Sequence, residues 1–481
     1  MFKDLREWLE MAKKAGELIV IDGTDTDDFG PVSQITSRNE GPAVLFQNVK
    51  GYPPGFRMGT NLMSNIRTFN MTIGLPLDFS IRQTVGVLSK KVKEWGENSV
   101  KFPPTAVDQA PILENIKQGN EIDLNIFPVP LWHDLDGGPY IGTADQVITR
   151  DPETGRVNLG TYRSQLFDSK TVGIYIAPGH HGRLHMDKYF QKGEPCPVVM
   201  VYGNDPLTFV ISSQEIPEIV PELNFIGAVR NESVPVITGK VTGLPIPAQA
   251  EVAVEGFMYP NKTKTEGPFG EWPGYYSGGA IDRPFLEPKI LYYRNDPILT
   301  GCPPAKASWA DQAFFRSVLR SALLYSEMLS ANVPGVKGVW CPQVGGSRHL
   351  EIIAIEQRYA GHATQAGVVA TQTRAGAMQG RYTIVVEDDI DIYDLEDVIW
   401  AMCTRSRPDE IDFIKNTWSS DTDPTIRKPA RILTTPRAII YAVRPWEWKD
   451  EFPKVDLATV ETRTKVFNKW KKLFGERWKK I

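Results

Sequence analysis

The sequence predicts an α/β chain of several domains: an N-terminal α/β lobe, a central β-rich domain, a connector helix, and a C-terminal α/β domain with a terminal helix. Three observations lead to this prediction. The chain has 481 residues, more than one hydrophobic core normally supports. Short strand-like runs punctuated by Pro, Gly, Asn and Asp fill its middle. After Pro334, strand and helix patterns alternate.

The N-terminal lobe is expected to span residues 1–110. Its first segment has helical periodicity, and the apolar positions share one face: Leu5, Trp8, Leu9 and Ala12. Gly16 stands where this helix is expected to end. Short strands are predicted at 17–21 and 43–49, so the lobe mixes helix and strand.

The central domain is expected to span residues 111–305 and to be barrel-like or sandwich-like. Its strand-like runs, among them VGIYIA, PVVMVYG and EVAVEGF, are separated by turn-forming residues. A connector helix is expected at 306–333, because a helical pattern covers 308–329 without interruption.

The C-terminal α/β domain is expected at 334–445. The runs HLEIIAIE and RYTIVVEDDID indicate two buried strands, each followed by a helical pattern, which predicts a parallel sheet. A tail helix is expected within 446–481, where the run TRTKVFNKWKKLFGERWKKI is basic and aromatic. One basic helix more often covers a surface or a partner than it binds a membrane or nucleic acid.

The overall composition argues against several classes of function. The formal net charge is −4 and the pI is about 6.0, so no general attraction to nucleic acid is expected. Neither a signal peptide nor a membrane-spanning run is recognised, so no membrane contact is expected. The four cysteines lie far apart without a CxxC pair, which favours a reducing, cytoplasmic location over a zinc ribbon or a disulfide framework.

The segment EGPFGE carries two carboxylates around a predicted bend. Glu266 and Glu271 are separated by Gly, Pro and Gly, which favour a tight turn over a helix. Two carboxylates brought close together cannot both ionise cheaply, so one of them can hold a proton near neutral pH and transfer it. An exposed acidic loop is the simpler alternative.

The segment NLGTYR places Asn158 and Arg163 five positions apart. On one extended strand such residues point to opposite faces, so the two side chains are expected to serve different ligands. If Arg163 faces the two glutamates, it keeps one of them ionised and can also bind a substrate carboxylate through two hydrogen bonds.

Half of the six histidines lie within PGHHGRLHMDKY. His181 and His185 have the i, i+4 spacing that puts two imidazoles on one helix face, a pattern typical of metal ligands. With Glu222 they define an alternative function, a metal-dependent hydrolase that activates water on zinc. Between these histidines and Glu222, the adjacent hydroxyls of Ser212 and Ser213 can bind a phosphate.

Taken in order, these motifs resemble those of the UbiD family of decarboxylases, whose cofactor is prenylated flavin mononucleotide (prenylated FMN). The Asn-x4-Arg, Arg-x17-His, Ser-Ser-x8-Glu and Glu-x4-Glu spacings are all present, and the resemblance extends over nearly the whole chain. It implies that the central domain is a split barrel that binds the flavin.

The resemblance also implies a set of ligands around that cofactor. A divalent metal, manganese or magnesium, would be held by Asn158, His181 and Glu222, with a potassium ion near Glu222 and Ser212. The other positions that match cofactor contacts are Thr143, Gly160, Thr161, Tyr162, Arg163, His180, Ser212, Ser213 and Gln214.

Two positions depart from the family pattern. Many relatives have a lysine four positions before the metal-binding histidine, where this chain has Ala177; Arg381 is a candidate substitute for that phosphate contact. Ser308 stands where several relatives carry a histidine, so an imidazole relay for phenolic or heteroaromatic acids is not expected. Trp272, directly after Glu271, is expected to give the substrate pocket a broad aromatic floor.

Arg163, Glu266 and Glu271 match the catalytic residues of the family. The implied reaction is reversible, non-oxidative decarboxylation of an aromatic or α,β-unsaturated acid, or of an aroyl-CoA, through a covalent adduct with prenylated FMN. Glu271 would act as general acid. The implied partners are the carboxylic acid, a flavin prenyltransferase that supplies the cofactor, and further copies of this chain in a homodimer or homohexamer. An assembly protein with a decayed site is a second alternative.

Overall fold

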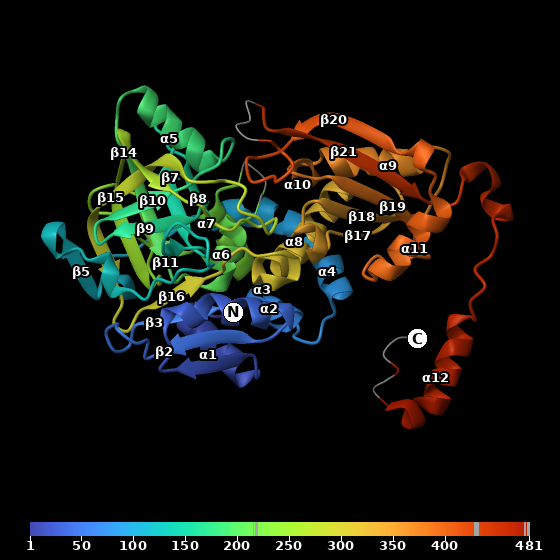
Figure 1. Cartoon of the computed structure of the whole chain (residues 1–481), viewed down its shortest axis with the longest axis horizontal. Coiled ribbons are helices and arrows are strands. Elements are labelled where there is room, and N and C mark those ends of the chain that lie inside the picture. The colour runs from blue at the N-terminus through green and yellow to red at the C-terminus, as the bar shows by residue number, and fades with distance from the viewer. Residues whose placement is uncertain (215, 217–219, 428–431, 476–477, 479–481) are drawn as a thin grey trace.

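The part of the chain that the structure describes folds around four β-sheets, in agreement with the multi-domain α/β prediction. The computed structural model describes residues 1–214, 216, 220–427, 432–475 and 478. In Figure 1 the N-terminal lobe lies below the central domain, and the C-terminal domain lies beside both. The predicted fold class is confirmed, while the domain boundaries stay a prediction.

The N-terminal lobe contains a four-stranded sheet in the order β1-β2-β3-β16. Its elements are α1 (Leu5–Lys14), β1 (Leu18–Asp22), α2 (Phe29–Arg38), β2 (Ala43–Gln47), β3 (Arg57–Thr60), α3 (Ile66–Ile73) and α4 (Ile81–Asn98). All four apolar positions predicted for the face of α1 are buried. Strand β16 (Ile298–Gly301) joins the sheet from far along the chain by pairing in parallel with β3, so it leads residues 302–309 out of this sheet.

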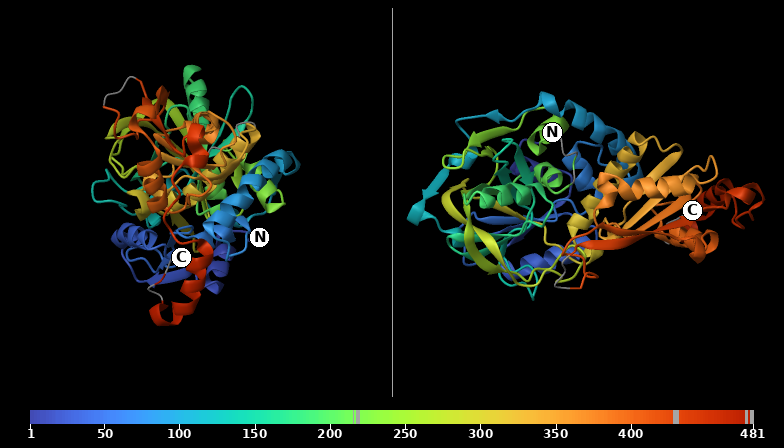
Figure 2. Two further views of the ribbon diagram at one scale, coloured as in Figure 1. Left: turned by 90° about the vertical axis from the view of Figure 1, so that its right-hand side faces the viewer. Right: turned by 90° about the horizontal axis from the view of Figure 1, so that it is seen from above.

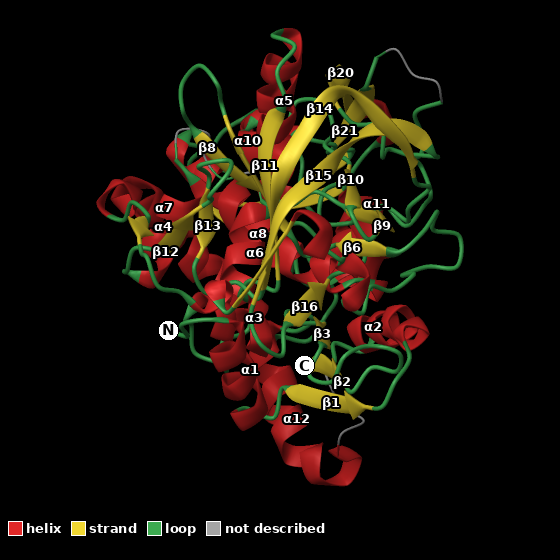
Figure 3. Cartoon of the chain, turned by 90° about the vertical axis from the view of Figure 1, so that its left-hand side faces the viewer, coloured by secondary structure: helices red, strands yellow, loops and turns green. Residues whose placement is uncertain are grey.

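The central domain is built on a nine-stranded sheet in the order β6-β9-β10-β15-β14-β11-β7-β8, with β5 added against β15. Its elements are β4 (Thr105–Ala106), β5 (Asn115–Gln118), β6 (Tyr140–Gly142), β7 (Gln146–Arg150), β8 (Val157–Gly160), β9 (Ser164–Asp168), β10 (Thr171–Ile174), α5 (His181–Gln191), β11 (Cys196–Tyr202), α6 (Pro206–Ser212), α7 (Glu222–Arg230), β12 (Pro235–Thr238), β13 (Pro245–Pro247), β14 (Val252–Glu266) and β15 (Ile281–Tyr293). The long antiparallel strands β14 and β15 curve strongly, and two register shifts interrupt their pairing. Such bulges bend a sheet, which helps this one curl into a half-barrel (Figure 3).

The C-terminal domain follows the connector helix and has a five-stranded sheet in the order β17-β18-β19-β21-β20. The right-hand view of Figure 2 shows this domain, in orange and red, beside the central domain. The elements from the connector onward are α8 (Asp311–Ser330), β17 (Val336–Trp340), β18 (Leu350–Ile355), α9 (His362–Gln372), α10 (Arg374–Ala377), β19 (Tyr382–Glu387), α11 (Leu395–Arg405), β20 (Asp412–Trp418), β21 (Thr434–Ala442) and α12 (Val460–Phe474). The two predicted strands, β18 and β19, are parallel as expected, and β21, which was not predicted, pairs in parallel with β19. Both edge strands, β17 and β20, are antiparallel. No α-helix lies between β17 and β18, and a parallel neighbour needs a long crossover.

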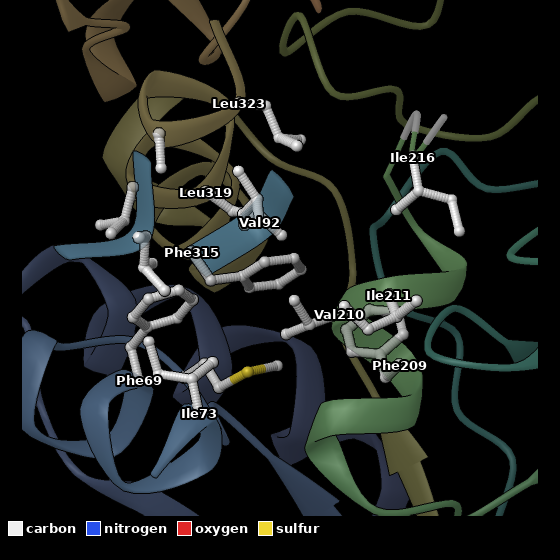
Figure 4. Close-up of a cluster of buried hydrophobic side chains, with 14 of the residues drawn as sticks. Phe69, Ile73, Val92, Phe209, Val210, Ile211, Ile216, Phe315, Leu319 and Leu323 are labelled. Carbon is white, nitrogen blue, oxygen red and sulfur yellow. The ribbon is translucent and has the colours of Figure 1, made fainter. Parts of the chain in front are cut away.

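One apolar cluster joins the lobe, the central domain and the connector helix. Figure 4 shows side chains from α3, α4, α6 and α8 packed together: Phe69, Ile73, Val92, Phe209, Val210, Ile211, Phe315, Leu319 and Leu323. Burying one such side chain stabilises the fold by about 1.5–3 kcal/mol, so this cluster firmly fixes α8 against the central domain. By contrast, α12 stands away from the body of the molecule in Figure 1. None of the described helices is both long and apolar enough to cross a bilayer.

Candidate active site

One cavity, here called the inner cavity, brings most of the predicted site residues together. Its walls come from the central domain, the connector helix and the C-terminal domain. The predicted residues that line it are Thr143, Asn158, Gly160, Thr161, Tyr162, Arg163, His180, His181, Ser212, Ser213, Gln214, Glu222 and Glu271. The remaining predicted residue, Glu266, is fully buried and contacts Arg163.

Asn158 and Arg163 both line this cavity, so the expectation that they serve opposite faces of a strand is wrong. Strand β8 ends at Gly160 and β9 begins only at Ser164, so the segment between them is not extended strand. A Cβ on Gly160 would lie 2.5 Å from the ring of Tyr162, so the chain can fold this tightly only with glycine there. Side chains therefore do not alternate regularly between two faces from Asn158 to Arg163.

The three predicted metal ligands come from different elements. Asn158 lies on β8, and His181 and Glu222 are the first residues of α5 and α7. Glu222 is 7% exposed, and burial raises the pKa of its carboxyl to about 7. Two oxygen donors and one imidazole suit a divalent cation, which would offset the cost of burying that charge. This donor set fits the predicted manganese or magnesium ion.

His185 does not join this group. Its Nδ1 lies 2.9 Å from the hydroxyl of Thr149, and burial lowers the pKa of the ring to about 4. Helix α5 packs on β7, which turns this side chain away from the inner cavity. Within the described ranges, no three His, Cys, Asp or Glu side chains are grouped to hold a metal. The hydrolase alternative, which needed His181, His185 and Glu222 together, is therefore wrong.

Hydroxyls and a helix N-terminus form a polar corner of the inner cavity. The Thr161 and Ser212 hydroxyl oxygens are 2.9 Å apart, and Ser213 and Gln214 follow on the same wall. Gln214 is 9% exposed, and its amide oxygen accepts no hydrogen bond from the residues the structure describes. His180 is the N-cap of α5, and the partial positive charge at the N-terminus of this helix favours an anion. The corner fits a phosphate group.

Arg381, the candidate substitute for the missing lysine, is engaged elsewhere. It pairs with Asp423 at 2.7 Å and is not among the described residues that line the inner cavity. Three other arginines do line it: Arg316, Arg348 and Arg374. Sequence reasoning missed them because no local motif marks them, and only the packing of the connector helix and C-terminal domain brings them to the central domain.

Arg163 holds both predicted carboxylates. Its Nε and Nη2 donate to the two oxygens of Glu266, each at 2.8 Å, and its Nη1 donates to Glu271. The hydroxyl of Tyr140 also donates to Glu266, at 2.7 Å. Glu266 is 0% exposed and Glu271 8% exposed, so EGPFGE is not an exposed acidic loop. A decayed site would have no reason to keep three buried charges in contact, which removes support for a non-catalytic assembly protein.

The two carboxyls differ in their surroundings. Burial raises the pKa of Glu271, and the charges of Glu266 and Asp421 raise it further, while Arg163 opposes the shift. Burial also opposes the charge on Arg163, but Glu271 and Glu266 outweigh burial and raise the pKa of the guanidinium. Glu266 accepts two hydrogen bonds from Arg163 and one from Tyr140, whereas Glu271 accepts one from Arg163. Glu271 is therefore the group suited to carry a proton.

A pH profile should report this proton. Because the raised pKa keeps Glu271 protonated above the range of an ordinary glutamate, decarboxylation should persist at low pH and fall as pH rises through that pKa. Measurement of kcat/KM from about pH 5 to about pH 9 on the holoenzyme, roughly two units on either side of neutral, checks it. A rate that climbs steadily across this range would contradict the acid assignment.

A second arginine, Arg283, lies next to the group formed by Arg163, Glu266 and Glu271. Arg283 lies 3.4 Å from Glu266 through its Nε and 3.8 Å from Asp421 through its Nη2. Both guanidinium groups lie over the ring of Tyr175, that of Arg163 at 4.5 Å and that of Arg283 at 3.7 Å from the ring centroid. The Tyr175 hydroxyl donates to Asp421. The segment between β20 and β21 therefore brings a carboxylate of the C-terminal domain to the acid–base group.

Asp421→Asn should move the basic limb of the pH profile to lower pH. The charge of Asp421 raises the pKa of Glu271, so neutralising it lowers that pKa and shortens the range over which the acid is protonated. Tyr175→Phe is the matched control, because it removes the hydrogen bond and keeps the charge. An unchanged basic limb in Asp421→Asn would show that the charge of Asp421 does not affect the pKa of Glu271.

The walls of the inner cavity next to Glu271 are partly aromatic. Trp272 lines the inner cavity, as expected, and its ring stacks 4.7 Å from that of His349. Trp418 lines the cavity from the C-terminal side. Ser308 accepts a hydrogen bond from Arg38 at 2.7 Å and lies outside the described lining. A flat ring is the shape that such walls accommodate.

Comparison with known families covers most of the chain. Residues 9–87, 105–307 and 313–442 match the N-terminal, Rift-related and C-terminal domains of 3-octaprenyl-4-hydroxybenzoate carboxy-lyase, UbiD. A phenolic acid decarboxylase of Streptomyces sp. (strain D7) is 30% identical over 86% of this chain and 87% of its own length. A pyrrole-2-carboxylic acid decarboxylase of Pseudomonas aeruginosa is 27% identical over 84% and 83%.

Solved structures agree with the fold. The UbiD-class enzyme HmfF from Pelotomaculum thermopropionicum, in complex with FMN, has a TM-score of 0.83 and 28% identity over 96% of this chain and 98% of its own. An evolved dimeric form of that enzyme, in complex with prenylated FMN, has a TM-score of 0.79 and 26% identity over 95% and 98%. The three family matches, the similar decarboxylases and the similar structures together show that this chain belongs to the UbiD family of carboxy-lyases, the prenylated-FMN-dependent decarboxylases.

Proposed function

We propose that this chain decarboxylates an aromatic or heteroaromatic carboxylic acid, reversibly, in the inner cavity. The observation that carries the proposal is the contact of Arg163 with both Glu266 and Glu271 beside the phosphate-binding corner. The aromatic walls formed by Trp272 and Trp418 support a flat substrate. The similar phenolic acid and pyrrole-2-carboxylic acid decarboxylases favour the same class.

The residues present fit prenylated FMN and its ions. Asn158, His181 and Glu222 would hold Mn²⁺ or Mg²⁺, and a potassium ion would lie near Glu222 and Ser212. The hydroxyl corner and the N-terminus of α5 would bind the phosphate. Arg374 would take the place of the lysine that Ala177 replaces, because it lines the same cavity and its charge acts on Glu222. When bound, the cofactor supplies a sink for the electron pair that carbon dioxide leaves behind.

The chain's own residues then handle the proton. Decarboxylation exchanges a carboxylate for a hydrogen, so one proton is consumed for each carbon dioxide released. Glu271 delivers that proton to the carbon and is left ionised beside Arg163. Glu266 keeps Arg163 fixed through two hydrogen bonds, so the guanidinium can hold Glu271 in place before and after the transfer.

A substrate panel tests the proposal. The chain is co-expressed with a flavin prenyltransferase, and carbon dioxide release is measured from benzoic, phenolic, pyrrole and furan carboxylic acids, an aroyl-CoA and a polyene acid. Release from at least one aromatic acid, dependent on the prenyltransferase, is expected. Turnover of the polyene acid alone would overturn the aromatic assignment and leave the family chemistry intact.

We also propose a homo-oligomer, a dimer or a hexamer. Helix α12 supports it, because apolar side chains of this helix are exposed in the single chain: Val460, Val466, Trp470, Leu473 and Phe474. Light scattering should give a mass of two or six chains, and Trp470→Ser with Leu473→Ser should lower it. A monomeric wild type would refute the proposal.

A further inference from the structure

A second cavity, here called the outer cavity, lies on the other side of Glu271. Its volume is about 270 Å³, and its walls come from α2, from residues 270–276 and from residues 304–309. Side chains at its mouth are well exposed, with Tyr275 at 62% and Trp309 at 40%. A water molecule needs about 10–15 Å³ of such space, so this cavity has room for several.

A thin partition separates the two cavities. Of the described lining residues, only Glu271 and Pro304 belong to both walls, and Glu271 is the one that can ionise. Two backbone hydrogen bonds close the turn that forms the partition: Glu271 N–H donates to Tyr275 O at 3.1 Å, and Gly274 N–H donates to Glu271 O at 2.8 Å. Trp272 faces the inner cavity and Tyr275 the outer one.

His133 and Asp136 form hydrogen bonds with the partition at Pro304 and next to Glu271. Asp136 lies 2.9 Å from Nδ1 of His133 and accepts the backbone N–H of Gly270, next to Glu271, at 3.0 Å. The other ring nitrogen of His133 lies 2.6 Å from the carbonyl of Pro304. His133 therefore links the two segments that meet in the partition, through Asp136 on one side and the Pro304 carbonyl on the other.

The stoichiometry of decarboxylation requires a proton supply. Each turnover replaces CO₂ on the substrate carbon by H, and the proton that Glu271 gives must be restored before the next turnover. Cofactor and substrate fill the inner cavity while this happens. The outer cavity is lined by the same residue, Glu271, and its mouth is open to solvent.

We propose that the outer cavity is the path by which solvent protons reach Glu271. Glu271 then takes up a proton from the outer cavity and gives it to the substrate carbon in the inner cavity. The inference rests on the proposed role of Glu271 as general acid. A substrate could pass only if the hydrogen-bonded turn opened, whereas a proton needs only water in the outer cavity and the carboxyl in the partition. In the reverse direction the same path returns the proton to solvent.

Filling the outer cavity tests the path. Ala305→Trp fills it from the central-domain side, and Gln34→Trp fills it from α2. Both holoenzymes should load cofactor normally, as measured by flavin absorbance. A positioned proton-transfer group contributes about 10²–10⁴-fold to rate, so a partial block should lower kcat at least about tenfold with little change in KM. Uptake of deuterium from D₂O into added product should slow by the same factor.

Ala331→Trp, which adds the same side chain at an exposed position in another part of the chain, is the matched control. A higher KM with unchanged kcat would identify the outer cavity as a substrate entrance and overturn the proposal. Unchanged kcat and deuterium uptake in both filled variants would also overturn it. If Glu271→Gln itself kept turnover and deuterium uptake, the failure would lie in the acid assignment and not in the path.

Discussion

Glu271→Gln is expected to abolish turnover while the protein keeps its cofactor. The amide preserves the size of the side chain and can still pack beside Arg163, but it has no proton to deliver. Loss of a positioned general acid costs about 10²–10⁴-fold in rate. Single-turnover carbon dioxide release, with flavin absorbance recorded on the same sample, separates the chemical step from cofactor loading.

The control for this variant is Glu287→Gln. This carboxylate lies on β15, pairs with Lys262 at the surface and lines neither cavity among the described residues. It should behave as wild type. Decarboxylation at the wild-type rate by Glu271→Gln would show that another group protonates the carbon.

His181→Ala is expected to deplete the purified protein of both metal and flavin. The imidazole is the one nitrogen donor of the proposed ligand set, and the metal would neutralise the flavin phosphate in a buried corner. Removal of a mere supporting partner costs about 10–100-fold in metal affinity, so removal of a ligand should cost more. Metal analysis and flavin absorbance per mole of folded chain measure the loss.

His185→Gln is the matched histidine control. His185 lies one turn after His181 in α5, and its ring is hydrogen-bonded to Thr149 away from the inner cavity. The His185→Gln variant should therefore keep metal and flavin. Full occupancy in His181→Ala would refute the proposed ligand set. Equal depletion in both variants would point instead to a general role of α5 in cofactor binding.

The sequence was most informative where a pattern is local. The buried face of α1, the connector helix and the closeness of Glu266 to Glu271, which both contact Arg163, all depend on spacing within a few residues, and each is present. The ordered motifs identified the family because their spacings are unusual in combination. Local spacing misled where the backbone leaves its regular period, as it does between Asn158 and Arg163.

Contacts between distant segments could not be predicted. Arg374 and Trp418 reach the inner cavity only because the C-terminal domain packs on the central one. Arg283 and Asp421 are separated by more than a hundred positions, and nothing in either local sequence indicates that they meet beside Tyr175. The parallel sheet was predicted from two of its inner strands, but the direction of an edge strand depends on its connection, which periodicity does not encode.

The distribution of the inner cavity's walls has a practical consequence for truncated forms of the enzyme. The Rift-related segment carries the acid and the proposed metal ligands, yet Gln312 and Arg316 belong to α8 and Trp418 to the C-terminal sheet. Expressed by itself, that segment would leave the nucleotide pocket open on one side. The three family segments are therefore evolutionary modules but not separable catalytic ones, and a split version of this protein should regain its flavin only when its halves reassociate.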